Sequence, residues 1–381
     1  MTVPATDTLA LARQLIACRS LTPDDAGSLA LLESRLRPLG FTCERLDRGG
    51  VANLWATHGT GRPLVCFAGH VDVVPPGPLE QWTSPPFDPV ERSGYLFGRG
   101  AADMKGSVAA MTTSFERLIR RAPGHRGTLA LLLTSDEEGD ALHGTVAVVE
   151  ALRARGITID QCVVGEPTSA ERFGDTVKNG RRGSLSGALR VRGIQCHVAY
   201  PERGRNPVHQ AAPALAELAT TEWDAGNEYF GPTTFQVSNI HAGTGAPNVV
   251  PGELEVHFNL RFSPQSPAAL LQERIRAVLD RHGLDYDLRW TLSAEPFMTP
   301  EGRLVETVRA AVLQESGVTP ALSTSGGTSD GRFLATVSNE VVEFGPMNDT
   351  IHKLDERVAV ADLDTLSRIY ERVAGGLVGL T

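Results

Sequence analysis

The apolar positions of residues 1–180 follow two different periods, which predict strands alternating with helices. Helical spacing predicts helices at 6–39, with a break near Thr22, and at 105–121 and 143–155. Short apolar runs bounded by turn residues predict strands at 41–45, 52–57, 64–68, 127–134 and 161–165. The run at 127–134 is almost unbroken, as is typical of a strand covered on both faces. This order predicts an α/β fold with a mostly parallel sheet.

The pattern changes near residue 180. Strands are predicted at 184–191 and 233–241, segment 249–262 alternates in polarity, and helices are predicted near 207–218 and 267–282. Helix 304–316, strand 340–344 and a closing helix from Val360 then resume the first pattern. We therefore expect a catalytic domain of residues 1–179 and 294–381, with a small α+β domain inserted at 180–293.

Metal-ligating side chains stand where predicted strands end or in adjoining loops. They are His70, Asp103, Glu137 or Glu138, Glu166 and, in a late loop, His352. Ligands at the carboxyl ends of parallel strands meet at one edge of a sheet. Imidazole and carboxylate without thiolate suit zinc, manganese or cobalt. Two divalent ions fit the charge better than one, because three carboxylates and a bridging hydroxide carry four negative charges.

Side-chain direction on an extended chain refines these roles. Residues two apart point the same way, so Asp72 can lie behind His70 and hydrogen-bond its other ring nitrogen. Adjacent residues point apart, so one of Glu137 and Glu138 can bind metal while the other handles protons. Each feature has an ordinary alternative, because a Glu-Glu pair can be a solvated strand end and His352 a surface histidine. Only their joint occurrence favours a metal site.

Composition narrows the classes of function. The 36 Lys and Arg against 45 Asp and Glu give a formal charge of −9, which argues against general binding of nucleic acid or anionic membranes. The N-terminus has no secretory pattern, and no stretch reaches the roughly 18 apolar residues of a membrane span. The five scattered cysteines suggest neither a disulfide framework nor a thiolate metal site. We expect a soluble cytoplasmic protein.

Eight motifs, spread in order over almost the whole chain, carry a family resemblance. The motifs GHVDVVP (69–75), GRGAADMKG (98–106), TSDEEG (134–139) and GEPT (165–168) resemble those of the dinuclear zinc aminoacylase and carboxypeptidase family. The motifs KNGRRGS (178–184), HVAYP (197–201), SGGTSDGRF (325–333) and EFGPMNDTIHK (343–353) narrow the resemblance. They are similar to those of members that remove the succinyl group from N-succinyl-LL-2,6-diaminopimelate in lysine and diaminopimelate biosynthesis.

The resemblance assigns roles to the ligands. It implies that Asp103 bridges two zinc ions, for which cobalt or manganese could substitute. One ion would bind His70 and Glu166, and the other would bind Glu138 and His352. The remaining implications are Glu137 as general base, Asp72 as the partner of His70, a cis peptide bond between Asp103 and Met104, and His197 acting in the partner subunit's cleft.

The substrate implied by the resemblance carries three carboxylates and one ammonium group, so it needs cationic and amide partners. Guanidinium groups can clamp carboxylates through paired hydrogen bonds, and glycine-rich loops offer backbone N–H groups. The residues that we expect to bind this small N-succinyl amino acid are Arg181, Ser184, Tyr200, Asn248, Arg261, Gly327, Thr328 and Asn348.

The inserted domain is expected to form a dimer interface or lid, because the unpaired edge of a strand such as 249–262 can join a second copy. The expected assembly is a homodimer. Two alternatives stay open. One is a related deacylase that acts on acetylornithine or another N-acyl amino acid, and the other is a non-catalytic metal- or peptide-binding protein. The intact Glu137 argues against the second.

Overall fold

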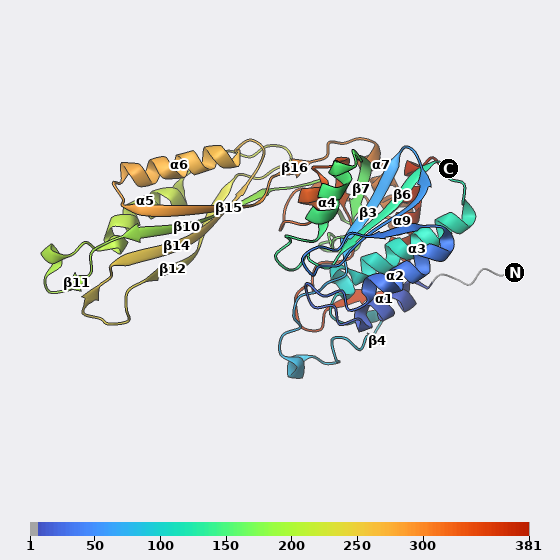
Figure 1. Cartoon of the computed structure of the whole chain (residues 1–381), viewed down its shortest axis with the longest axis horizontal. Coiled ribbons are helices and arrows are strands. Elements are labelled where there is room, and N and C mark those ends of the chain that lie inside the picture. Colours follow the sequence, from blue (N-terminus) through green and yellow to red (C-terminus); the bar gives the residue numbers. More distant parts are fainter. Residues whose placement is uncertain (1–6, 381) are drawn as a thin grey trace. The chain divides into compact units, whose positions relative to one another are not determined.

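The structure is a computed structural model that describes residues 7–380, and it divides into two compact units. Unit 1 contains the described chain up to Gly180, Met298–Ser323 and the chain from Ser329 onward. Unit 2 contains Arg181–Phe297 and Thr324–Thr328. Residues 1–6 and 381, which the sequence assigns to the catalytic domain, lie outside the described residues. Figure 1 labels many of the elements of each unit.

Unit 1 is built on an eight-stranded sheet. Its spatial order is β1 (Thr42–Arg45), β2 (Asn53–Thr60), β6 (Gly127–Thr134), β3 (Leu64–His70), β7 (Ile159–Val164), β18 (Ser338–Glu343), β8 (Thr176–Lys178) and β17 (Ala321–Ser323). The central strands β6, β3, β7 and β18 run parallel, as does the outer pair β8 and β17. The other neighbouring pairs are antiparallel. The predicted α/β class with a mostly parallel sheet is confirmed.

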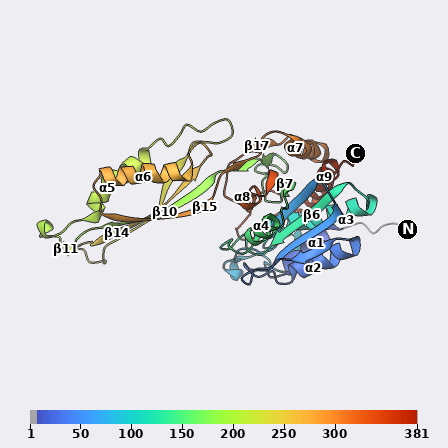
Figure 2. The ribbon, with the colours of Figure 1, turned by 45° about the horizontal axis from the view of Figure 1, so that its top comes forward.

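Helices cover both faces of this sheet, as Figure 2 shows. One face carries α1 (Thr8–Ala17), α2 (Ser28–Leu36), α3 (Gly106–Arg121), α7 (Arg303–Ser316) and α9 (Val360–Leu377). The other carries α4 (Thr145–Ala154) and the short α8 (Gly331–Leu334). Every residue of β6 is consequently buried, in agreement with its unbroken apolar run. A single apolar core joins the helices of the first face to the sheet.

The segment 75–100 contains three short elements. They are η2 (Leu79–Gln81), β4 (Val90–Arg92) and β5 (Tyr95–Phe97), and β5 pairs with β19 (Arg357–Ala359). A π-helical turn, η3 (Ala101–Lys105), then leads into α3. Its Asp103–Met104 peptide bond is cis, as the resemblance implies. Strands of three residues, including β8 and β17, are too short to show a period, so the sequence pattern missed them.

Unit 2 contains a four-stranded antiparallel sheet and two helices. The sheet order is β12 (Thr234–Ala242), β14 (Glu253–Phe262), β10 (Gly183–Arg192) and β15 (Tyr286–Ala294). Apolar side chains of this sheet pack against α5 (Pro207–Thr220) and α6 (Ala268–Arg281). Gly187 stands opposite Phe258, and a Cβ on that glycine would come within 2.2 Å of the phenyl ring. The glycine therefore makes room for the aromatic core.

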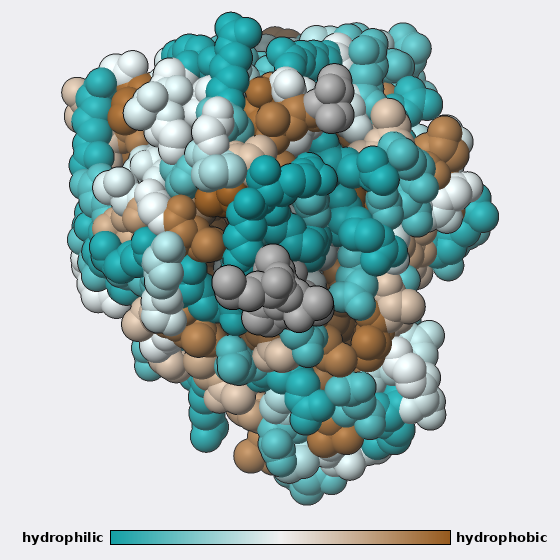
Figure 3. Space-filling view, turned by 90° about the vertical axis from the view of Figure 1, so that its right-hand side faces the viewer, coloured by the Kyte–Doolittle hydropathy of each residue, from teal (hydrophilic) through white to brown (hydrophobic). Residues whose placement is uncertain are grey.

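The remaining short elements complete the chain. They are η1 (Arg37–Leu39), β9 (Gly180–Arg181), β11 (Cys196–His197), η4 (Pro201–Arg203), β13 (Val249–Val250) and β16 (Phe297–Met298). In residues 7–380 no helix combines the length and the hydropathy of a membrane span. The face of the molecule shown in Figure 3 mixes hydrophilic and hydrophobic residues. All five cysteines are free thiols.

Candidate metal centre

Two groups of ligands share one carboxylate in unit 1. His70, Asp103 and Glu166 form the first group, and Asp103, Glu138 and His352 form the second. Within each group the ligand atoms all lie within 4.8 Å of one another. The structure thus brings together all five residues that the sequence nominates as metal ligands. Asp103 stands where a bridging carboxylate would stand, although the assignment of ions to groups stays a prediction.

The parallel strands explain why these residues converge. His70 is the last residue of β3, Glu138 follows its neighbour β6, and Glu166 follows its other neighbour β7. Their carboxyl ends meet at one edge, where a doubly wound sheet usually carries its site. Two glycines at this edge make room for Met104, because a Cβ on Gly69 or Gly165 would lie 2.2 or 2.7 Å from its methyl group.

The His70 ring is held from both sides. Its Nε2 lies 3.2 Å from Asp103 Oδ1 and 4.0 Å from Glu166 Oε1. Its Nδ1 lies 2.9 Å from the main-chain carbonyl oxygen of Asp72 and 3.6 Å from the carboxylate Oδ1 of the same residue. Because a carbonyl oxygen can only accept, this contact makes Nδ1 the N–H donor and leaves Nε2 for a metal.

The Asp72 carboxylate has a second use that sequence reasoning missed. It is fully buried, and it accepts hydrogen bonds from the backbone N–H groups of Glu137 at 3.4 Å and Glu138 at 3.1 Å. Asp72 therefore fixes the main chain that carries both glutamates, as well as contacting His70. The alternation of an extended chain could place Asp72 behind His70, but it could not reveal which loop would fold over the carboxylate.

Electrostatics at the centre favour bound cations. Burial raises the pKa of the Glu137 carboxyl, and the charge of Glu166 raises it further. Hydrogen bonds to Asp103 and Glu138 raise the pKa of His352 to about 10. Burial lowers the pKa of His70, but its hydrogen bonds to acidic neighbours outweigh burial and leave the pKa well above its ordinary value. The carboxylates thus stabilise any positive charge that enters the centre.

The donor set fits a pair of divalent ions. Two imidazoles and three carboxylates, with no thiolate in either group, are typical ligands of zinc, manganese or cobalt. The His352 side chain is half exposed, whereas Asp103 and Glu138 are each 8% exposed. Within the second ligand group, His352 is therefore the ligand most accessible to solvent.

Two buried acidic residues beside this centre were not nominated from the sequence. Asp330 is 3% exposed, and burial raises its pKa to about 6. Glu356 is 1% exposed and lies four residues after His352. From the 325–333 motif the sequence nominates Gly327 and Thr328 for substrate binding, but not Asp330. The sequence carries no signal that either carboxyl is buried.

The residues nominated for substrate binding fall in both units. Asn348 belongs to unit 1, and the others belong to unit 2, namely Arg181, Ser184, Tyr200, Asn248, Arg261, Gly327 and Thr328. Arg181 Nη1 donates to the carbonyl oxygen of Ser325 at 3.0 Å, so this guanidinium holds the glycine-rich loop. Gly326 has a φ of +100°, and a Cβ there would lie 2.7 Å from Arg181 Nη1. Ser184 pairs with Arg261 across β10 and β14.

His197 lies on the short strand β11 of unit 2, where it pairs with Val249 of β13. Its Nδ1 accepts the backbone N–H of Ala199 at 3.0 Å, so the neutral ring carries its proton on Nε2. The ring lies 5.8 Å from that of Tyr200, and the main-chain oxygen of neighbouring Asn248 accepts from Val198 N at 3.0 Å. His197 therefore presents an N–H donor, although its catalytic role stays a prediction.

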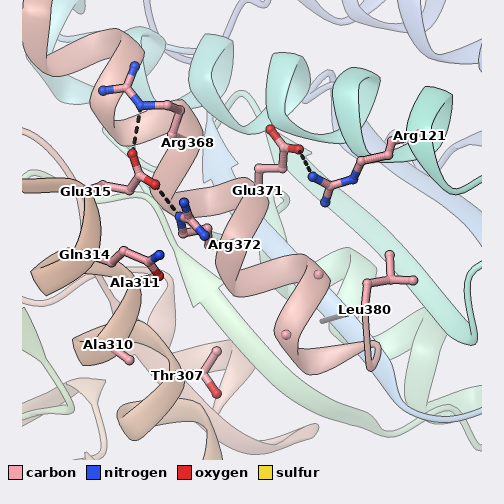
Figure 4. A pocket seen from close by; sticks show the side chains of 12 residues that line it. Arg121, Thr307, Ala310, Ala311, Gln314, Glu315, Arg368, Glu371, Arg372 and Leu380 are labelled. Carbon is pink, nitrogen blue, oxygen red and sulfur yellow. Dashed lines mark hydrogen bonds and ion pairs between the residues drawn. The ribbon is translucent and has the colours of Figure 1, made fainter.

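A cavity of about 570 Å³ lies elsewhere in unit 1, and Figure 4 shows its lining. Its charged side chains are paired with one another, because Glu315 accepts from Arg368 and Arg372 while Glu371 pairs with Arg121. None of the five nominated metal ligands lines it. The cavity therefore does not coincide with the candidate centre.

Comparison with known proteins places this geometry in a family. The sequence model for peptidase family M20/M25/M40 matches residues 66–375, a span that includes all five nominated ligands. The chain belongs to peptidase family M20/M25/M40. Among solved structures, this M20 family member resembles the YXEP protein of Bacillus subtilis, described as a dinuclear metal-binding peptidase, with a TM-score of 0.75 and 15% identity over 99% of both chains.

Curated relatives of this M20 family member are much more similar in sequence. A succinyl-diaminopimelate desuccinylase from Azoarcus sp. (strain BH72) is 60% identical over 378 residues, which cover 99% of this chain and 100% of the relative. A succinyl-diaminopimelate desuccinylase from Alkalilimnicola ehrlichii is 63% identical over 373 residues, with coverage of 98% and 100%. The family resemblance inferred from the eight motifs is confirmed.

Proposed function

We propose that this protein hydrolyses the succinyl amide of N-succinyl-LL-2,6-diaminopimelate, giving succinate and LL-2,6-diaminopimelate for lysine and diaminopimelate biosynthesis. The observation that carries the proposal is the sharing of Asp103 by two ligand groups, with Glu137 on the adjacent loop. Relatives of about 60% identity that bear the desuccinylase name support the choice of substrate.

We propose zinc as the resident metal, with one ion in each ligand group; cobalt and manganese accept the same donors. The described dinuclear metal binding of the Bacillus subtilis protein supports this number. Two divalent ions bound there would supply Lewis-acid activation of water and of the amide carbonyl.

The protein's own groups would handle the protons and hold the reactants. In the proposal, Glu137 accepts a proton from the attacking water and later passes it to the departing amine. Asp72 keeps Glu137 in place through the backbone N–H that it accepts. The N–H on Nε2 of His197 would donate to the oxygen of the amide as negative charge develops there.

Specificity for a succinyl group requires a partner for its terminal carboxylate. We propose Arg261 for this role, on the alternating strand β14, with Arg181 holding the glycine-rich loop that contains Gly327 and Thr328. Asn248, Asn348, Ser184 and Tyr200 complete the proposed set of polar contacts.

We also propose a homodimer that forms through unit 2 and in which His197 serves the partner subunit. Exposed apolar side chains of unit 2 support an interface there: Ile194, Val198, Tyr200, Val208, Ile240 and Leu292. The expectation of an unpaired edge on segment 249–262 is wrong, because its main strand β14 pairs with β12 on one side and β10 on the other. The outer strand β12 has a free edge within the unit-2 sheet and supports an interface in its place. The cytoplasmic location stays a prediction.

The proposed reaction can be tested directly. The protein would be stripped of metal, reloaded with zinc and incubated with N-succinyl-LL-2,6-diaminopimelate while succinate and free amine are both measured. We expect the wild-type protein to release succinate and free amine in equal amounts. A chelator should abolish this release, and the Asp103→Ala variant should release neither product. Folded, zinc-loaded protein that releases neither product would overturn the proposal, and release from N-acetylornithine alone would point to the related deacylases.

A further inference from the structure

The buried carboxylate of Glu356 accepts four hydrogen bonds from the loop that carries Asp103. Its Oε2 accepts from Arg99 Nη1 at 2.8 Å and from the backbone N–H of Gly100 at 2.9 Å. Its Oε1 accepts from the backbone N–H groups of Ala102 and Asp103, both at 3.0 Å. Three backbone amides of this loop and one guanidinium group therefore donate to a single side chain.

The same residue ties this loop to the segment that carries His352. The main-chain oxygen of Glu356 accepts from Gly98 N at 2.9 Å, so side chain and backbone both contact the 98–103 segment. Arg99 is 2% exposed and packs over the ring of Trp82, 5.2 Å from its centroid. Glu356 is thus buried, and it links the loop of the shared ligand Asp103 to the chain segment that carries His352.

The energetics favour a specific role over general packing. A carboxylate taken out of water costs several kcal/mol unless charge and hydrogen bonds compensate it. Here each oxygen accepts two N–H groups, and three of the four donors are main-chain groups of residues 100–103. This arrangement constrains the direction in which the backbone of Asp103 presents its side chain.

We propose that Glu356 is a positioning residue that fixes the main chain of Asp103 and thereby the shared metal ligand. Groups behind metal ligands commonly change metal affinity by about 10- to 100-fold when they are replaced. The inference rests on the metal centre of the proposed function, but it concerns the protein's own loop and can be measured without turnover.

Glu356→Gln tests it with a matched control. Glutamine keeps the shape but replaces one oxygen with an NH₂ group, which cannot accept from two N–H donors. The control is Glu116→Gln, since Glu116 is 2% exposed and its carboxylate accepts two hydrogen bonds from the partly buried Arg35. Both variants lose a buried carboxylate, but only Glu356 contacts the Asp103 loop.

The first readout is hydrogen exchange of the metal-free proteins, measured by mass spectrometry on peptides covering residues 98–105. Exchange there should be faster in Glu356→Gln than in wild type and unchanged in Glu116→Gln. The second readout is zinc affinity, measured against a competing chelator. We expect binding about 10- to 100-fold weaker in Glu356→Gln and wild-type affinity in Glu116→Gln.

A folded Glu356→Gln protein with wild-type exchange at 98–105 and wild-type zinc affinity would overturn the positioning role. If that variant does not fold, Glu356→Asp takes its place, because it keeps the charge beside Arg99 while withdrawing the carboxylate by one methylene; the same two readouts then decide. Absence of desuccinylation by the wild-type protein would refute the proposed function without altering either readout.

Discussion

Replacement of Glu137 by glutamine should separate metal binding from proton transfer. The change preserves the shape of the side chain, and the backbone N–H that Glu137 donates to Asp72 is untouched. The neighbouring Glu138, which also donates its backbone N–H to Asp72, should keep its place in the ligand group. We therefore expect Glu137→Gln to bind both metals as the wild type does.

The expected loss of rate follows from the chemistry removed. A glutamine amide cannot accept the proton of the attacking water, and general bases contribute about 10²- to 10⁴-fold to catalysis. This range corresponds to roughly 2.7–5.4 kcal/mol in the activation barrier, at about 1.36 kcal/mol per tenfold change in rate. The measurement is kcat for succinate release, combined with metal content by mass spectrometry on the same sample.

Glu138→Gln provides the matched comparison. Because Glu138 contacts His352 at 3.0 Å within the second ligand group, its replacement should lower the metal content as well as the rate. Substantial activity in Glu137→Gln would mean that the roles of general base and metal ligand are exchanged between Glu137 and Glu138. Loss of metal from Glu137→Gln, with retention of both ions by Glu138→Gln, would mean the same.

Three further predictions concern specificity, assembly and acid stability. Arg261→Ala should lower kcat/KM for the succinylated substrate more than for an acetylated analogue, by a difference of about 1.5–3 kcal/mol. The control Arg190→Ala removes an exposed partner of a surface glutamate and should lower kcat/KM for neither substrate. Equal losses on both substrates for Arg261→Ala would show that Arg261 does not recognise the succinyl group. His197→Ala and Glu137→Ala chains, each nearly inactive alone, should together recover roughly a quarter of wild-type activity after random exchange, because half of the dimers are then mixed and each mixed dimer has one intact site. Full exchange without recovered activity would mean that His197 serves the site of its own subunit. Burial and the charge of the neighbouring His125 imidazole lower the pKa of His58, so the unfolded chain binds a proton before the folded protein does. As pH falls from about 6.5 through the lowered folded pKa, the wild type should therefore lose more Tm than His58→Gln, and equal losses of Tm in the two proteins would contradict this.

The sequence predicts the fold class because its central strands are long enough to show a pattern. The 127–134 run is apolar throughout and forms the fully buried β6, and the predicted closing helix from Val360 forms α9. Several elements that it misses, such as β8 (Thr176–Lys178), contain at most three residues and complete no period. Their positions depend on pairing with strands that are distant in sequence, which a local pattern does not contain.

The candidate ligands are predictable for a different reason. They follow strands that end at one edge of the sheet, so the topology gathers them once the strands are known. The residues that hold them are not predictable in this way. Glu356 stands in the polar sequence Leu-Asp-Glu-Arg, which is typical of a solvated loop, and only the tertiary structure shows its burial. Asp72 likewise contacts a loop that lies 65 residues away in sequence.

The central claim is that this centre removes succinyl groups rather than acyl groups in general. Its most direct test is a side-by-side measurement of kcat/KM for N-succinyl- and N-acetyl-LL-2,6-diaminopimelate with the zinc-loaded wild-type protein. A charge-assisted contact to the succinyl carboxylate contributes about 1.5–3 kcal/mol, so the account predicts a preference for the succinylated substrate on the order of 10- to 100-fold. Equal rates on both substrates, or a preference for the acetylated one, would contradict it.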